Sequence, residues 1–141
     1  MSRQVLAVLA VGLIFPLKVG AVPDRPDKKK ADPAREEMKR LEGTWVFTRG
    51  SNRVTICDGT YTATTPQGKL VLSAAMTIDP TKNPKWLTMR YTAGAFKGNT
   101  LLGIYEVKGD TLRVYIPSSG KRPTQFPTGA VNWLRRLKKS P

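Results

Sequence analysis

Apolar and polar side chains alternate along most of the chain from Gly43 onward. A period of two places successive side chains on opposite faces of an extended backbone, so each alternating segment predicts a β-strand with one apolar face. The alternation is clearest in the segments 44–48, 69–78, 86–91 and 111–116. No apolar pattern with the period of a helix interrupts these segments, which excludes a parallel sheet connected by crossover helices.

Turn sequences separate the alternating segments and indicate how many strands there are. The pair Asp58-Gly59 stands between the segments 53–57 and 60–64, and this arrangement predicts a tight hairpin. Residues typical of turns also mark the segments 66–68, 79–84, 94–99 and 109–110. A longer loop, 117–129, precedes the last segment, 130–137. We therefore expect eight strands between Leu41 and Leu137.

Eight strands joined by consecutive short connections are typical of an antiparallel up-and-down meander. An all-β fold in which this meander closes into a barrel removes the unpaired edges, and eight strands suit such closure. An open sandwich is the alternative. A short N-terminal helix is expected before the barrel, from Pro33 to about Leu41, since Asp32 can cap its first turn. Met38 and Leu41 share one face of this helix and are expected to cover one end of the barrel.

The first 21 residues have the layout of a secretory signal peptide. Arg3 precedes an apolar run of eleven residues, Val5–Phe15, which is too short to cross a hydrocarbon core of about 30 Å. Small residues end at Ala21, where cleavage is expected. We divide the chain into a signal peptide (1–21), an exposed tether with the short helix (22–40), the barrel (41–137) and a basic tail (138–141). A secreted or periplasmic protein is expected, without a transmembrane span after cleavage.

Composition restricts the chemistry that the chain can perform. It has no histidine and one cysteine, Cys57, which excludes His-dependent catalysis, intrachain disulfides and Cys-cluster zinc sites. We expect no enzymatic activity, no metal site and no cofactor. Cys57 is interpreted as a small apolar side chain in a strand, with an intermolecular disulfide as the alternative. The net charge is +14, and removal of Arg3 and Lys18 with the signal peptide lowers it to +12.

Four segments carry a resemblance to a known family. They are Leu41–Trp45, Asp79–Trp86, Thr100–Leu112 and Arg122–Phe126. Together they resemble a family of small secreted domains of uncharacterised function that is abundant in planctomycete bacteria. That family is similar in architecture to lipocalins and other calycin-like barrels. The resemblance therefore implies a lipocalin-like barrel, and it supplies no catalytic residues.

The Gly43-x-Trp45 element is similar to the first-strand motif of lipocalins. In lipocalins that Trp packs at the closed end of the barrel against an Arg near the last strand, and Arg136 is the residue that we match to it. The resemblance implies a cation–π contact between Trp45 and Arg136, worth about 0.5–2 kcal/mol and structural in role.

The inner face of the barrel is the first candidate binding site. The residues expected to line it are Trp45, Phe47, Met89, Tyr91, Ile104 and Leu112. An eight-stranded barrel either holds one small ligand or is filled by its own side chains, and the size of these residues favours filling. Tyr105 and Trp86 lie on the opposite faces of their strands and are expected to make contacts on the outer surface.

Glu106 is the acidic residue that stands out, because the alternation places it on the same strand face as Ile104. An ionised carboxylate inside a barrel is costly unless it is paired. We therefore expect an ion pair or hydrogen bond from Glu106 to Arg113 or Arg122, and a structural role in preference to a catalytic one.

The basic residues form the second candidate site. Those expected to attract acidic polymers are Lys121, Arg122, Arg135, Lys138 and Lys139. Lys and Arg patches bind anionic chains with an affinity that falls as salt rises, and nucleic acid is not expected as the partner of a secreted protein. We expect a binding or structural module of the cell envelope, with a small apolar ligand as one candidate. The alternative is a basic adaptor for acidic polymers, either glycans or anionic lipids.

Overall fold

The structure is a computed structural model that describes Gly20 and residues 30–138. The predicted signal peptide, apart from Gly20, lies outside the described residues, as do most of the predicted tether and Lys139 of the basic tail. The compact unit that contains the barrel begins at Ala31. The helix therefore belongs to the barrel unit, whereas the sequence had grouped it with the exposed tether.

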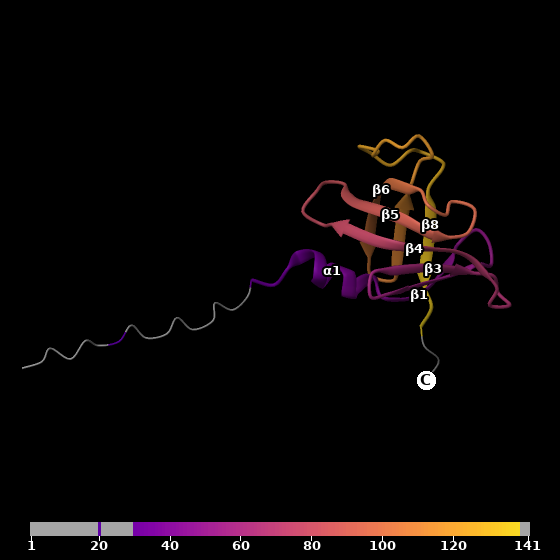
Figure 1. Ribbon diagram of the computed structural model, residues 1–141, viewed down its shortest axis with the longest axis horizontal. Helices are drawn as coiled ribbons and strands as arrows, with labels where there is room; N and C mark the ends of the chain where they lie inside the picture. The colour runs from indigo at the N-terminus through magenta and orange to yellow at the C-terminus, as the bar shows by residue number, and fades with distance from the viewer. Residues whose placement is uncertain (1–19, 21–29, 139–141) are drawn as a thin grey trace, which may run out of the picture. The chain divides into compact units, whose positions relative to one another are not determined.

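Eight antiparallel strands form a closed barrel in the order of the sequence (Figure 1), which confirms the predicted fold. The strands are β1 (Gly43–Phe47), β2 (Arg53–Cys57), β3 (Thr60–Thr64), β4 (Leu70–Asp79), β5 (Lys85–Ala93), β6 (Thr100–Lys108), β7 (Thr111–Tyr115) and β8 (Asn132–Arg136). Each strand pairs with its neighbours in sequence. β1 also pairs with β8, with Trp45 opposite Arg136 and Phe47 opposite Leu134, and this pairing excludes the open sandwich.

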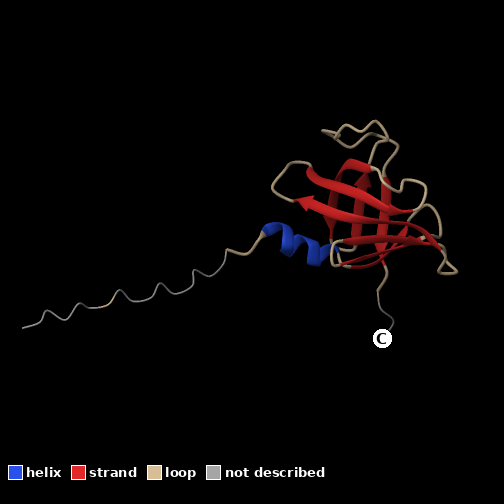
Figure 2. Cartoon of the chain, in the orientation of Figure 1, coloured by secondary structure: helices blue, strands red, loops and turns tan. Residues whose placement is uncertain are grey.

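Helix α1 (Pro33–Leu41) lies at one end of the barrel, as Figure 2 shows in blue. The Asp32 carboxylate accepts a hydrogen bond from the Ala34 N–H at 3.0 Å and caps the helix as expected. Leu41 is buried and Met38 packs against the core. We call this end of the barrel the closed end. The loops 48–52, 65–69 and 94–99 lie at the opposite end, the open end, because antiparallel connections alternate between ends.

The β2–β3 turn shows how local sequence sets the register. Asp58 and Gly59 have φ values of 46° and 71°, so both central residues of this two-residue turn have positive φ. Such a turn matches the right-handed twist of the strands that flank it, and glycine adopts this conformation without steric cost. The turn leaves Cys57 opposite Thr60, so the predicted Asp-Gly hairpin is confirmed.

The register between β5 and β6 corrects the prediction for β6. Tyr105 pairs with Lys85, is 2% exposed and packs in the core, so its predicted outer position is wrong. Ile104 pairs with Trp86, which is 40% exposed, so both lie on the outer face and Ile104 does not line the interior. Both faces of β6 carry apolar residues, so the alternation could not show which of them faces the interior. Trp86 lies outside, as predicted.

Candidate functional site

The interior of the barrel is filled. Within the described residues, the void at its centre measures about 10 Å³, whereas pockets for small molecules measure roughly 300–1,000 Å³. Met89 and Leu112 line this void. Trp45 and Tyr91 are buried in the surrounding core, and Phe47 packs against it. These five residues, which were predicted to line the interior, are therefore part of the packed core. The interior leaves no room for a bound ligand.

The closed end is held by a contact between Trp45 and Arg136. The Arg136 guanidinium carbon lies 4.2 Å from the centre of the Trp45 ring, as the lipocalin motif implies. The same guanidinium donates hydrogen bonds to the backbone carbonyls of Glu42, at 2.6 Å, and Arg40. Gly43 has φ 129°, and a Cβ there would lie 3.0 Å from Nη1 of Arg136, so glycine suits both the backbone and the packing. This arrangement joins the last strand to the end of α1 and is structural.

A buried ion pair attaches α1 to the barrel. Glu37 is 5% exposed, and its carboxylate pairs with the Lys85 ammonium and lies 3.5 Å from the Tyr105 hydroxyl. Burial and the nearby Glu37 charge raise the pKa of Tyr105, so the phenol stays protonated at neutral pH. The sequence analysis missed this role of Glu37. Its spacing of four residues from the buried Leu41 was the available signal, because such residues share a helix face.

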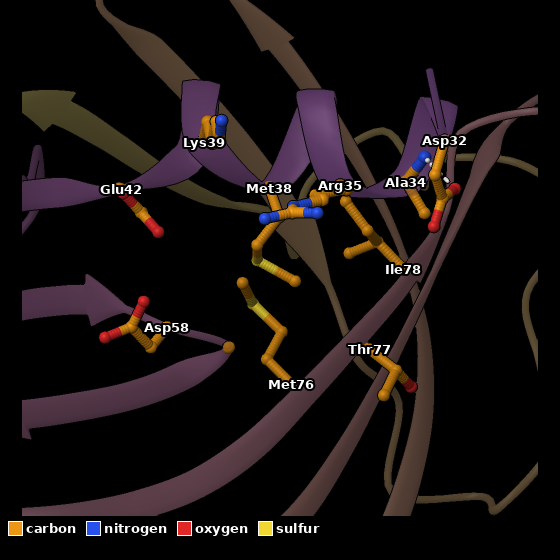
Figure 3. Close-up of a pocket in the computed structure, with 11 residues that line it drawn as sticks. Asp32, Ala34, Arg35, Met38, Lys39, Glu42, Asp58, Met76, Thr77 and Ile78 are labelled. Carbon is orange, nitrogen blue, oxygen red and sulfur yellow. Dashed lines mark hydrogen bonds between the residues drawn. The ribbon is translucent and has the colours of Figure 1, made fainter. Parts of the chain in front are cut away.

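An open groove lies beside α1 (Figure 3), with a volume of about 610 Å³. Met38 from the helix and Met76 from β4 point toward one another in this view, and Ile78 lies beside them. Five charged residues also line the groove, namely Asp32, Arg35, Lys39, Glu42 and Asp58. Acidic and basic groups are nearly balanced there. The groove thus offers an apolar floor and a charged rim without a strong preference for anions.

The outer face of β6, β7 and β8 carries a second, smaller hollow of about 310 Å³, which we call the outer hollow. It is lined by Glu106, Lys108, Thr111, Arg113 and Trp133. The strand register brings these residues together, since Arg113 pairs with both Glu106 and Trp133, and Thr111 pairs with Lys108. The Trp133 side chain is 43% exposed, so an indole surface faces solvent between basic groups.

Glu106 lies in this outer hollow, and its predicted inward position is therefore wrong. Its carboxylate pairs with Arg113 at 2.7 Å and with Lys108 at 3.3 Å. The predicted pairing with Arg113 is confirmed. The Arg113 guanidinium also lies 3.8 Å from the centre of the Phe126 ring and 5.3 Å from that of Trp133. Arg113 is thus held from three sides and positions the Trp133 indole.

Arg122 forms a separate cluster on the outer face of β5 and β6. Its guanidinium donates hydrogen bonds to the carbonyls of Leu87 and Gly103, at 2.8 and 2.7 Å, and to the Thr88 hydroxyl at 2.9 Å. It also lies 4.7 Å from the centre of the Trp86 ring. These contacts attach the loop 116–131 to the barrel. Desolvation lowers the pKa of Arg122, in accord with a structural role more than with a free anion-binding charge.

The other predicted polyanion residues do not gather at one point. Lys121, Arg135 and Lys138 are exposed, and Lys139 lies outside the described residues. Arg135 is the one that borders the outer hollow, because it pairs with Thr111 on β7. The structure thus brings Arg135 close to Trp133 and Lys108, while Lys121 belongs to the loop that carries Arg122.

Cys57 is exposed at the end of β2, so the prediction of a strand position is confirmed, but the side chain is not buried. The neighbouring Asp58 carboxylate raises the pKa of the thiol, which disfavours the reactive thiolate. Among the described residues, no group of three or more His, Cys, Asp or Glu side chains is placed to hold a metal ion. None of the helices in the described part of the chain has the length and hydropathy needed to cross a membrane.

Comparisons with protein-family models, curated proteins and solved structures found no match. The resemblance to the planctomycete family therefore stays a prediction that rests on the four sequence segments.

Proposed function

We propose that the protein is a secreted, non-enzymatic module of the cell envelope that binds an acidic glycan at the outer hollow. The observation that carries the proposal is the exposed Trp133 indole, which lies in a concave surface beside Lys108 and Arg135. The filled interior supports it indirectly, because a barrel without an inner cavity has to bind through its outer surface.

The chemistry of the outer hollow suits a charged sugar. An indole face offers an apolar surface to a flat, partly apolar ring, while Lys and Arg pair with carboxylate or sulfate groups. Glu106 does not repel such a ligand strongly, since Arg113 and Lys108 already neutralise its carboxylate. The excess of basic residues over the whole chain adds long-range attraction to an acidic polymer.

The Trp86 indole is exposed to a similar degree but is a poorer platform. Its ring already has two cations of the chain within 5 Å of its centre, Lys82 at 4.8 Å and Arg122 at 4.7 Å. A ligand would have to displace these contacts, and Arg122 is held by three hydrogen bonds. The Trp133 ring has one such contact, from Arg113 at 5.3 Å, so more of its surface is free for a ligand than at Trp86.

The test is salt-gradient elution from immobilised heparin, with purified protein that lacks residues 1–21. We expect retention that weakens as salt screens the charges. Trp133→Ala and Arg135→Glu should each weaken binding to soluble heparin by about tenfold, the loss typical of a central aromatic or charged contact. Passage through the column in low salt would contradict the proposal.

Two matched variants control for general effects. Trp86→Ala removes an indole of similar exposure outside the hollow, and Lys39→Glu makes the same charge reversal on α1. Both should bind heparin within about twofold of the unchanged protein, because surface changes away from a site have small effects. If all four variants lose the same affinity, the binding is unspecific charge attraction and the proposed site is wrong. If the protein binds single-stranded DNA more tightly than heparin, the proposed ligand class is wrong.

A small amphiphile in the groove beside α1 is a second candidate, favoured by the apolar floor of Met38, Met76 and Ile78. This would relocate the small apolar ligand from the interior to the surface. A fluorescent fatty-acid analogue should bind, and Met38→Gln should weaken its binding by about tenfold, since a polar amide replaces an apolar side chain that lines the groove. Leu137→Gln changes an exposed apolar residue elsewhere and should have no effect. Equal affinity in both variants would exclude the groove.

A further inference from the structure

The acidic residues of the described ranges are unevenly placed on the barrel, whereas basic residues occur at both of its ends. All acidic residues of the described ranges belong to the closed-end half, in α1 and its flanks or in strand ends and turns: Asp32, Glu36, Glu37, Glu42, Asp58, Asp79, Glu106 and Asp110. The open-end loops 48–52, 65–69 and 94–99 contain no acidic residue. Exposed basic residues occur there instead, namely Arg49, Arg53, Lys69 and Lys97. The open end is therefore a purely cationic surface on a barrel whose acids lie elsewhere.

Apolar side chains are exposed at the same end. Leu70 is 50% exposed, Val71 39% and Phe96 43%. Lys69 precedes Leu70 and Val71 in the sequence, and Lys97 follows Phe96. Phe96 is positioned by the Tyr91 ring, whose centre lies 5.3 Å away. We call Leu70, Val71 and Phe96 the open-end patch. Neighbouring exposed apolar residues with a polar rim are a feature of interaction surfaces, and here lysines supply that rim.

The backbone holds the patch together. Gly94, with φ 93°, packs so closely on β4 that a Cβ would lie 2.5 Å from the Val71 carbonyl oxygen. The loop 94–99 therefore lies directly against the first residues of β4. It is also tied to β5, since the Gly98 N–H donates to the Tyr91 carbonyl at 2.9 Å. Phe96 and Val71 are therefore exposed on two segments whose backbones are in direct contact.

We infer that the open end docks onto an anionic lipid surface. Apolar side chains that enter the interface and lysines that pair with anionic headgroups together bind membranes of negative surface charge. The absence of acidic residues in the three loops removes the repulsion that would oppose such contact. The closed end, with its acids, would then point away from the membrane. This inference concerns a different surface from the outer hollow, and it holds or fails independently of glycan binding.

The test is sedimentation with vesicles, using purified protein that lacks residues 1–21. Vesicles of phosphatidylglycerol and phosphatidylcholine in equal parts should carry the protein into the pellet, and vesicles of phosphatidylcholine alone should not. The double variant Val71→Ser/Phe96→Ser should reduce the partition coefficient by about tenfold or more through the lost apolar contact. Lys69→Glu and Lys97→Glu should each reduce it by about fivefold or more, because each removes an attraction to the anionic surface.

Matched changes at the closed end are the controls. Leu137→Ser removes an apolar side chain that is 37% exposed, and Lys39→Glu reverses an exposed charge on α1. Both should keep the partition coefficient within about twofold. The lysine variants leave every apolar contact intact, so they test the inference even if the double variant unfolds. Equal losses at both ends would overturn it, as would open-end variants that lose binding to soluble heparin and keep binding to vesicles.

Discussion

The guanidinium of Arg136 stacks on Trp45 at 4.2 Å while it donates to the Glu42 and Arg40 carbonyls at the end of α1. One side chain of the last strand thus contacts the first strand and the helix before it. The Trp45 indole N–H completes the link through a hydrogen bond to the Leu41 carbonyl at 2.9 Å. Closure of the barrel and attachment of the helix therefore depend on the same few contacts.

Replacement of Arg136 should lower the free energy of unfolding more than replacement of its neighbour. Arg136→Ala removes the stack and two charge-assisted hydrogen bonds, and we expect a loss of about 2–3 kcal/mol in urea denaturation. Arg135→Ala is the control, because its side chain is exposed on the adjacent position, and it should change stability by about 0.5 kcal/mol or less. Similar losses for both variants would show that the stack contributes little.

The buried Glu37 should prove essential for the attachment of α1. Glu37→Ala leaves the Lys85 ammonium and the Tyr105 hydroxyl without their acceptor, and we expect a loss of about 2–4 kcal/mol in thermal or urea unfolding. Glu36→Ala, on the exposed side of the same helix, should have a much smaller effect.

A double variant separates the ion pair from the packing around it. Glu37→Leu/Lys85→Leu removes both charges, so it should be more stable than Glu37→Ala alone, since it does not leave the partly buried Lys85 ammonium without its partner. If Glu37→Leu/Lys85→Leu is as unstable as Glu37→Ala, the loss of stability comes from altered packing and not from the unpaired charge.

The Thr81 side chain should set the titration of Asp79. The Thr81 hydroxyl and N–H donate to the Asp79 carboxylate at 2.5 and 3.0 Å, and these two hydrogen bonds hold the pKa of Asp79 below its ordinary value. A lowered pKa stabilises the fold above the unfolded value of roughly 3.9, and this contribution is lost as pH falls through the folded value. Thr81→Val should raise the pKa of Asp79 in an NMR titration, whereas Thr81→Ser should keep it low. An unchanged pKa in Thr81→Val would assign the shift to the backbone N–H alone.

The close approach of β6 and β7 at Gly103 should not tolerate a methyl group. A Cβ on Gly103 would lie 2.6 Å from the Tyr115 carbonyl oxygen and 2.7 Å from Cγ1 of Ile116. Gly103→Ala should therefore destabilise the barrel by about 1–3 kcal/mol, the usual effect of overpacking. Gly129→Ala is the matched control, because a Cβ there meets nothing within 4 Å. Equal thermal midpoints for the two variants would show that the strands move apart without cost.

The local parts of the fold were predictable from the sequence. The Asp58-Gly59 hairpin, the Asp32 cap and the eight strands each depend on residues close in the chain, whose preferences act before any tertiary contact forms. The outcome at Trp86 was also predictable, because one face of its strand is clearly apolar. The Trp45–Arg136 contact followed from the resemblance to lipocalins and not from the spacing of residues.

The direction of β6 and the location of the candidate sites were decided only by the tertiary structure. Tyr105 and Ile104 are both apolar enough to be buried, and only the pairing with β5 chose which one faces inward. Glu106 lies on the same outer face as Ile104. The loop that carries Arg122 covers the apolar surface on that face.

The sequence by itself therefore determined that the basic chain forms eight antiparallel strands, since alternation and turns are local properties. It favoured closure into a barrel, and the pairing of β1 with β8 decided it. The size of the expected lining residues already favoured a filled interior, which the structure confirms. Tertiary structure alone decided that Trp133 lies in a basic hollow and that the acid-free loops share one end of the barrel. The physical reason is that strand pairing brings residues together across long separations in sequence. Where both faces of a strand carry apolar residues, as in β6, alternation does not encode which side chains face inward, and pairing with the neighbouring strand decides it.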